Sequence, residues 1–214
     1  MVAIKKKFPT FDDGSIDVDR WLQHAQKMYP LETIELLQKT ILLAKETSKG
    51  LTTFYGQACL EQSLEMAEII LNLKLDSNAV AAAILTSTLQ HTSLTIEIIK
   101  EKLGDEVSKL CAGVLQMNII NTLQANINKT RNQAQIDRLR KTFLAMVSDI
   151  RVVLIKLAER TCIMRGIKNI NPTERKRLAQ ETMDIYAPLA NRLGIGQLKW
   201  ELEDISFHYI DSET

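Results

Sequence analysis

Residues 76–91 read DSNAVAAAILTSTLQH and carry a dense helical pattern of apolar side chains. Val80 and Ile84 recur at helical spacing, and Leu89 and the alanines fill the faces between them. A helix that is apolar on most sides is buried in the core of a protein. Asp76 stands immediately before the pattern, where a carboxylate accepts hydrogen bonds from the first free backbone amides. The stretch therefore predicts a capped and buried helix.

Similar periodicity predicts helices on both sides of this stretch. The expected helices are a short one near 18–28, then 34–44 after Pro30, 60–71 after Gly56, 92–103 closed by Gly104, a helix capped by Asp105 and running through Leu115, 134–148, 150–165, 172 to about Pro188, and 197–209. Residues 118–132, NIINTLQANINKTRN, are rich in asparagine and lack clear periodicity. We interpret them as a loop.

Two local patterns refine this description. Residues 152–155, Val-Val-Leu-Ile, would suit a buried strand by propensity alone. No turn residues or partner strand accompany them, which favours a buried helix. Residues 171–174, Asn-Pro-Thr-Glu, are typical of a helix start. Asn171 would cap the helix, Pro172 fill its first position, and Glu174 reach back to the cap.

The composition supports a helical protein. The 214 residues include 8 glycines and 4 prolines, against roughly 15 and 11 at average usage. Few turn-forming residues favour long helices over many short strands. The formal net charge of +1 excludes a protein that binds nucleic acid through a strongly basic surface. We expect an all-α fold with about nine to eleven helices in a single domain.

The cysteines and the N-terminus indicate the compartment. Cys59, Cys111 and Cys162 are widely spaced and include no CxxC pair, which argues against disulfides or a zinc site. Buried, reduced thiols are the expected alternative. The lysines at 5–7 precede no apolar stretch, so no signal peptide is predicted. No apolar run reaches the roughly 18 residues of a membrane span. A cytoplasmic protein is expected.

The residues alone point to no particular chemistry, because no phosphate-loop, dinucleotide, nucleophile-elbow or zinc-protease motif occurs. His91 with Glu97 and Glu101 is a concentrated group of potential metal ligands, and a polar helix surface explains it equally well. The basic runs at 5–7 and 175–177 are interpreted as solvated faces, with phosphate binding as the alternative.

Two longer segments resemble a known family. Residues 185–204 read IYAPLANRLGIGQLKWELED, and residues 146–165 read MVSDIRVVLIKLAERTCIMR. Both are similar to the hydrolase-type domain of long RelA/SpoT homologues, the enzymes of the alarmone (p)ppGpp. The similarity covers roughly 30–210 and implies a helical HD-type fold. In active members, Mn²⁺ is held by an early His, a His-Asp pair and a late Asp, and a Glu-Asp pair helps to activate the attacking water.

The resemblance allows each of these positions to be placed in this chain. Thr86 and Ser87 stand at the His-Asp pair, and Gln62 stands at the early His. Glu159 stands at the late Asp. The remaining positions are Gln90 and His91 at the Glu-Asp pair, and Cys162 where a further His usually follows the late Asp. Among the four ligand positions only Glu159 keeps a metal-binding group.

This loss predicts a domain without hydrolase activity. Neutral amide and hydroxyl oxygens bind Mn²⁺ weakly, and without the ion no hydroxide forms near neutral pH. We therefore expect neither metal nor cofactor here, and expect the Thr86 and Ser87 hydroxyls to bond within their own helix. Within the family, such pseudo-hydrolase domains are typical of RelA-type synthetases, which move pyrophosphate from ATP to GTP or GDP in a Mg²⁺-dependent domain.

The resemblance also implies boundaries and partners. Residues 1–30 would be an extension, 31–196 the pseudo-hydrolase domain, and 197–214 the start of a helix leading to a synthetase domain of the same protein. That domain is the expected partner, with Leu198, Trp200 and Leu202 as candidate contacts or, alternatively, core residues. The ribosome and deacylated tRNA would be bound by later domains, and this domain itself would bind neither nucleic acid nor membrane.

Two other hypotheses remain open. The domain could keep residual metal-dependent phosphohydrolase activity through Glu159 and His91. It could also bind nucleotide or a protein at the old pocket without catalysis. In that case Lys49, Lys156 and Arg160 are candidate phosphate contacts, because Lys156 and Arg160 lie one helical turn apart. A salt-bridge pair on the helix surface is the alternative interpretation of those two.

Overall fold

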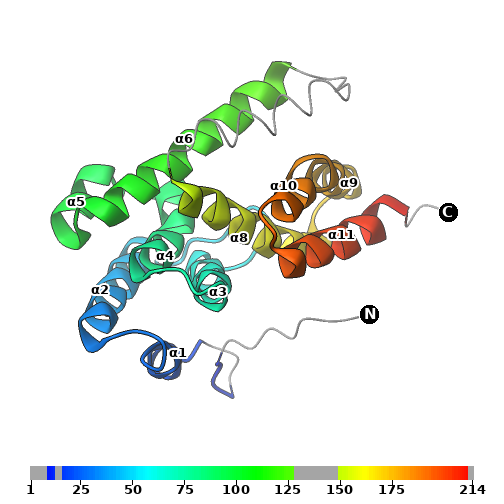
Figure 1. The fold of residues 1–214 in the computed structure, drawn as a ribbon. Coiled ribbons are helices and arrows are strands. Elements are labelled where there is room, and N and C mark those ends of the chain that lie inside the picture. Colours follow the sequence, from blue (N-terminus) through cyan, green and yellow to red (C-terminus); the bar gives the residue numbers. More distant parts are fainter. Residues whose placement is uncertain (1–8, 13–15, 128–148, 212–214) are drawn as a thin grey trace. The chain divides into compact units, whose positions relative to one another are not determined.

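The computed structural model describes residues 9–12, 16–127 and 149–211, and for 119–127 the backbone only. Figure 1 shows the described chain as a set of helices joined by short connections. The elements are α1 (Val18–Ala25), α2 (Leu31–Thr47), α3 (Cys59–Asn72), α4 (Ser77–His91), α5 (Ile96–Leu103), α6 (Asp105–Ile127), α8 (Ile150–Gly166), the 3-10 turn η1 (Ile167–Asn169), α9 (Pro172–Glu181), the π-helical turn η2 (Thr182–Tyr186), α10 (Ala187–Arg192) and α11 (Gly196–Asp211).

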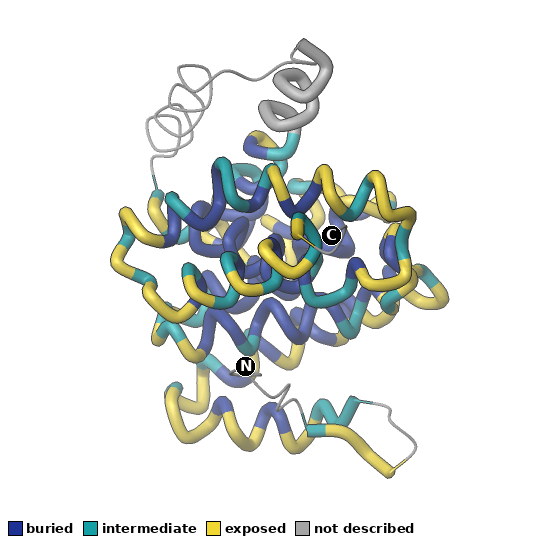
Figure 2. Tube along the Cα trace, turned by 90° about the vertical axis from the view of Figure 1, so that its right-hand side faces the viewer, coloured by how far each residue is buried: buried dark blue, intermediate teal, exposed yellow. Residues whose placement is uncertain are grey.

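The prediction of an all-α fold is confirmed. The described residues contain no β-strand, only isolated bridges between Thr10 and Ile16 and between Thr52 and Ala58. Helix α2 has buried positions every three or four residues with exposed positions between them, whereas α3, α4 and α8 are buried along most of their length; Figure 2 colours buried, intermediate and exposed residues separately. Within the described part of the chain, no helix combines the length and the apolar character needed to cross a membrane.

The chain forms two compact units. Unit 1 contains the described residues up to Thr53 together with Gln57–Ala112, and unit 2 contains Phe54–Gly56 and the described residues from Gly113 onward. The division falls inside α6.

Unit 1 is built around α4. The Asp76 carboxylate accepts hydrogen bonds from the amides of Asn78 and Ala79 at 3.0 and 3.1 Å, which confirms the predicted cap. Helix α4 packs against α3 and α2, and α1 packs against α2. Trp21 of α1 is fully buried, and its indole N–H donates to Glu68 of α3 at 2.7 Å. Helix α1, which lies in the predicted 1–30 extension, therefore contributes to the packing of unit 1.

Unit 2 consists mainly of α8 to α11, and α11 packs against α8, α9, η2 and α10. Residues 152–155 lie in α8, so the helical prediction for them is confirmed. Gly166 is the last residue of α8, and the Tyr55 ring packs directly against it. A Cβ at position 166 would lie 2.4 Å from that ring. Only glycine allows that approach.

The loop predicted for 118–132 is wrong over 118–127, because α6 continues to Ile127. Asparagine lowers helix propensity by less than about 0.7 kcal/mol per residue. A helix already nucleated by the residues before it can absorb that loss. Residues 128–132, and the helix predicted for 134–148, lie outside the described residues.

Two predicted helix starts need correction. Asp105 is the first residue of α6 rather than its cap. Gly104 precedes it with φ +94°, and its carbonyl accepts from the Ser108 amide at 3.3 Å. At the start of α9, Asn171 accepts from the Thr173 amide at 2.8 Å as predicted. Glu174, however, binds Arg177 instead of reaching back to the cap.

Pro188 does not end the helix that begins at Pro172. The ring of a proline clashes with the carbonyl four residues before it in a continuous α-helix. Here the turn before Pro188 is the π-helical η2, and the Ala187 amide donates to the Thr182 carbonyl five residues back. The wider turn accommodates Pro188 at the start of α10. The helical path therefore continues to Arg192.

Candidate functional site

Three of the four ligand positions that the family resemblance assigns lie in unit 1. Gln62 lies on α3, and Thr86 and Ser87 lie on α4, the helix that packs against α3. All three are buried, with Gln62 the most exposed at 5%. Their side chains offer amide and hydroxyl oxygens and no formal charge. We refer to these three residues as the seam between α3 and α4. The seam is polar, but it carries no formal charge at the positions that the family resemblance assigns to metal binding.

The two hydroxyls of this seam differ. Thr86 Oγ1 donates to the Ala82 carbonyl at 3.0 Å, as expected for a threonine bonding within its own helix. The same expectation is wrong for Ser87, whose buried hydroxyl has no hydrogen-bond partner among the described residues. The buried hydroxyls of Ser63 and Thr88 share that state. An unmade buried hydrogen bond costs about 1–3 kcal/mol.

Gln90 and His91 end α4 and are exposed, as is Lys49. His91 is the last residue of α4. Thus α3 and α4 hold Gln62, Thr86 and Ser87 as buried residues, whereas the two residues at the family's Glu-Asp positions lie on the surface.

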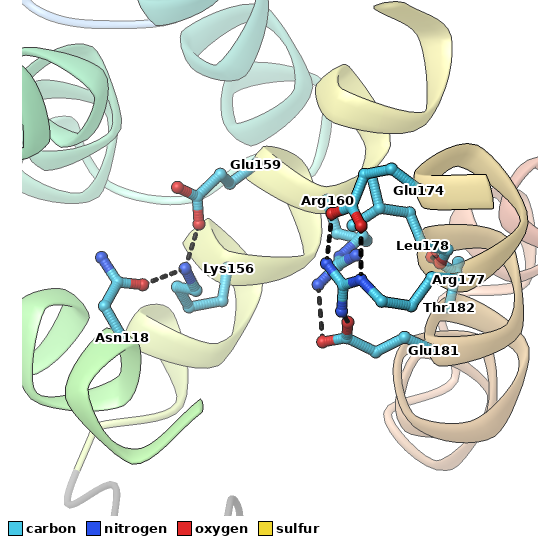
Figure 3. A network of polar contacts seen from close by, with 9 residues as sticks. All are labelled: Asn118, Lys156, Glu159, Arg160, Glu174, Arg177, Leu178, Glu181 and Thr182. Atoms are coloured by element: carbon cyan, nitrogen blue, oxygen red, sulfur yellow. Dashed lines mark hydrogen bonds and ion pairs between the residues drawn. The ribbon is translucent and has the colours of Figure 1, made fainter. Parts of the chain in front are cut away.

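The ligand position that lies in unit 2 is charged. Glu159, on α8, is 5% exposed, and its carboxylate pairs with the ammonium of Lys156 one turn earlier. Lys156 is also buried, and its ammonium donates a second hydrogen bond to the side-chain carbonyl of Asn118 on α6 (Figure 3). A buried carboxylate requires a partner of opposite charge. In this chain that partner is Lys156.

The next residue, Arg160, faces a different set of groups. Its Nη2 donates to Glu181 Oε1 at 3.0 Å, and its guanidinium lies 4.1 Å from the centre of the Tyr186 ring. Burial lowers the pKa of Arg160. Tyr186 and the carboxylates of Glu181 and Glu159 together raise it by more than burial lowers it, so the pKa of Arg160 is above its ordinary value. Arg160 is therefore a permanent cation.

Lys156 and Arg160 do not form the surface salt-bridge pair considered from the sequence. Both are buried, and they reach different carboxylates. Figure 3 shows Glu159 and Asn118 both joined to the Lys156 ammonium, and Arg160 joined to Glu181. Joint binding of a phosphate by these two side chains stays a prediction.

The donor set does not fit a divalent ion. Gln62, Thr86 and Ser87 provide neutral oxygens, and the carboxylate of Glu159 is engaged by Lys156. Among the described residues, no group of three or more His, Cys, Asp or Glu side chains is arranged to hold a metal. Cys59, Cys111 and Cys162 are buried and form no disulfide, as predicted, and burial raises the pKa of the Cys111 thiol to about 12. A protonated thiol is a poor metal ligand.

Sequence reasoning did not identify three partners of α8. Asn118 falls in the segment interpreted as a loop, and its contact with Lys156 depends on the continuation of α6. Glu181 is the last residue of α9, and Tyr186 is the last residue of η2, a turn that no motif predicts. Tyr186 stands two residues before Pro188, and that proline is the available signal for irregular geometry there.

Comparisons with known proteins agree with this architecture. A family model described as an HD domain matches residues 41–196. A GTP pyrophosphokinase of Myxococcus xanthus is 36% identical over 201 residues, which are 94% of this chain and 26% of that protein. A bifunctional (p)ppGpp synthase/hydrolase SpoT of Escherichia coli strain K12 is 35% identical over 185 residues, 86% of this chain and 26% of the relative.

A solved structure, from work on a metazoan ortholog of SpoT that hydrolyzes ppGpp, matches with a TM-score of 0.54 at 17% identity. The match covers 84% of this chain and 96% of that one, and it concerns the fold alone. The present chain spans about a quarter of the length of the curated relatives. The chain is therefore an HD domain of the RelA/SpoT family.

Proposed function

We propose that this chain is the non-catalytic regulatory HD domain of a RelA-type GTP pyrophosphokinase. The observation that best supports this proposal is the buried ion pair between Glu159 and Lys156. Glu159 is the only carboxylate left at the family's four ligand positions. An internal ammonium supplies the positive charge that a metal ion would otherwise supply to it.

The neutral seam supports the same proposal. An active hydrolase needs anionic ligands to hold its ion and generate hydroxide at neutral pH. Gln62, Thr86 and Ser87 cannot provide them, and removing charges that have no metal avoids a desolvation penalty. The named relatives include both synthetases and hydrolases, so this distinction rests on the side chains of the present chain.

The proposed partner is a synthetase domain of the same protein, contacted through α11. Leu198 and Leu202 are buried in unit 2 and belong to its core. Trp200 and Phe207 are 68% and 51% exposed and lie seven residues apart, so they share one face of α11. We propose that these two aromatic side chains make the contact. Synthesis of (p)ppGpp in the cytoplasm, and binding of ribosome and deacylated tRNA, would belong to other domains of that protein.

The test is a manganese titration with radiolabelled ppGpp, in which release of 3′-pyrophosphate is measured. The bifunctional E. coli relative is the positive control. We expect no release above the blank at any Mn²⁺ concentration. Release that rises with Mn²⁺ and is lost in Glu159→Gln would show a residual hydrolase and overturn the proposal.

A further inference from the structure

Helix α11 carries a row of exposed side chains opposite its buried face. Trp200, Asp204 and Phe207 are exposed, and at about 100° per residue they project within about 60° of one another. Leu198 and Leu202 are buried on the other side of the helix. We call Trp200, Asp204 and Phe207 the outer stripe of α11. Large apolar side chains that gather on one face among polar residues mark interaction surfaces, whereas isolated ones are ordinary.

Two arginines from neighbouring helices hold α11 in this orientation. Arg165 of α8 donates to both carboxylate oxygens of Glu201, at 2.5 and 3.0 Å, and both side chains are largely buried. A bidentate pair of this kind fixes orientation as well as distance. Arg175 of α9 lies 5.3 Å from the centre of the Tyr209 ring, two turns further along α11. These contacts keep the outer stripe on the outside of unit 2.

The outer stripe contains a carboxylate whose charge is not balanced within the described part of the chain. Glu201 is paired as described above, and Glu203 pairs with Lys199 at 2.8 Å. Lys199 also lies 4.0 Å from the centre of the Trp200 ring, so its charge is engaged within α11. Asp204 has no hydrogen bond or ion pair with another described residue. The stripe therefore combines two aromatic side chains with an uncompensated negative charge between them.

The position of Asp204 restricts what can cover this stripe. In water an exposed carboxylate is solvated and requires no partner. A surface that covers both Trp200 and Phe207 also covers Asp204, because that residue lies between them on the same face. A charge removed from water is costly unless it is paired. The covering surface must therefore supply a positive charge at this point.

A second copy of α11 does not supply it. If two copies of the helix paired in parallel, Asp204 would face Asp204 of the other copy. If they paired antiparallel with Trp200 against Phe207, Asp204 would face Glu203 of the other copy. Like charges opposed across an interface disfavour association. The charge pattern thus favours a different, basic surface.

We propose that the surface which covers the outer stripe, on the synthetase domain of the same protein, presents a lysine or arginine to Asp204 between two apolar sites for Trp200 and Phe207. The choice of the synthetase domain rests on the proposed function. The requirement for a cation follows from the position of Asp204 alone. A charge matched in this way fixes the register of the contact and excludes acidic partners.

The test exposes the chain to a displayed library of amphipathic helical peptides, in which basic, acidic and neutral residues are equally frequent at every polar position. Peptides that bind the wild type but not Trp200→Ala are retained. We expect lysine or arginine to be enriched at one polar position of these peptides, and aspartate or glutamate to be enriched there when the selection is repeated on Asp204→Lys. A neutral or acidic preference on the wild type, a preference that Asp204→Lys leaves unchanged, or the absence of any peptide that depends on Trp200 would overturn the proposal.

The affinity of the peptide most enriched on the wild type provides a matched comparison, measured by fluorescence anisotropy. Asp204→Lys should weaken binding by about tenfold, because it exchanges an attractive exposed pair for a repulsive one. Asp204→Asn should fall between Asp204→Lys and the wild type. Phe54→Ala removes a 58% exposed aromatic side chain from another part of unit 2 and should leave binding unchanged. Equal affinity for the wild type and Asp204→Lys contradicts the proposal, as does a loss in Phe54→Ala that matches the loss in Trp200→Ala.

Sedimentation of the chain alone tests the second copy as the occupant. We expect a monomer, and a dimer that dissociates in Trp200→Ala would assign the outer stripe to self-association and overturn the proposal. The proposed function fails by a different result, the Mn²⁺-dependent release of 3′-pyrophosphate described above. That release would leave the charge preference at Asp204 to be decided by the peptides.

Discussion

The residues at the family's ligand positions differ in charge between unit 1 and unit 2. In the seam between α3 and α4, Gln62, Thr86 and Ser87 are neutral, so the charges expected in the family are absent. On α8, Glu159 remains charged and is balanced by Lys156 within the same helix. The unit 1 positions carry no charge to balance, whereas the unit 2 carboxylate is paired with an ammonium of its own helix. A neighbouring side chain can therefore supply the positive charge that a buried carboxylate needs.

Removing one partner of the α8 pair should have the largest effect on stability. Lys156→Met leaves a buried carboxylate without its counter-ion and should lower the free energy of unfolding by about 3–5 kcal/mol. Urea denaturation followed by circular dichroism measures this change.

The matched control for that variant is Lys199→Met, which removes a partly exposed pair with Glu203 at 2.8 Å. It should change the free energy of unfolding by less than about 1 kcal/mol. If Lys156→Met also lowers the free energy of unfolding by less than about 1 kcal/mol, the α8 pair is not required for stability. The contrast between the neutral positions of unit 1 and the ion pair of unit 2 would then fail.

Adding a charge to the neutral seam is the converse change. Ser87→Asp places a carboxylate where Ser87 is 2% exposed, and burial raises the pKa of such a group. We expect the free energy of unfolding to fall by about 3 kcal/mol at neutral pH, because raising a pKa by about two units costs that much. The loss should shrink as the pH falls and the carboxyl becomes protonated. Ser87→Asn, similar in size but uncharged, is the control, and an equal loss in both would assign the effect to size.

Removing the unpaired hydroxyl should have a smaller effect of opposite sign. Ser87→Ala eliminates a buried group that lacks a hydrogen-bond partner among the described residues. Unfolding should become less favourable by up to about 1 kcal/mol, because the penalty of the unmade bond disappears and alanine favours helix. Thermal denaturation, with Thr86→Ala expected to destabilise, distinguishes the two hydroxyls. A destabilised Ser87→Ala would reveal a partner for that hydroxyl.

The smallest expected effect concerns the start of α8. Arg151 donates to Asp149 at 2.5 and 3.0 Å, and these bonds hold the pKa of Asp149 below its ordinary value. The ion pair therefore stabilises the fold above pH about 4 and is lost as the pH falls through the depressed pKa. Asp149→Asn should be less stable than wild type by under about 1 kcal/mol at neutral pH.

The pH profile of that variant provides the check. Urea midpoints of wild type and Asp149→Asn should converge as the pH is lowered below the Asp149 pKa, since the wild-type carboxyl is then neutral. Midpoints that diverge on acidification would reverse the sign and contradict the assignment of the pKa shift to Arg151.

The helices could be predicted because their causes are local. Apolar spacing and the caps at Asp76 and Asn171 depend on residues close together in sequence. The failures have non-local or irregular causes. The continuation of α6 through 118–127 has no periodic signal, and the passage of Pro188 depends on the η2 turn.

The candidate site shows the same limit. The resemblance placed Gln62, Thr86, Ser87 and Glu159, but it could not give the partners of Lys156 or Arg160. Asn118 of α6 lies 38 residues from Lys156 along the chain, and Glu181 at the end of α9 lies 21 residues from Arg160. Tyr186, the other partner of Arg160, belongs to η2. Contacts at such separations follow from the fold and not from a motif.

Direct measurement of Mn²⁺ binding tests the central claim most closely. Electron paramagnetic resonance detects free aqueous Mn²⁺, and binding to protein reduces that signal. For the wild-type chain we predict no loss of signal at protein concentrations where an active family hydrolase binds one ion per chain. A stoichiometric loss that Glu159→Gln abolishes would show that Glu159 holds a metal in spite of Lys156, and would contradict the account.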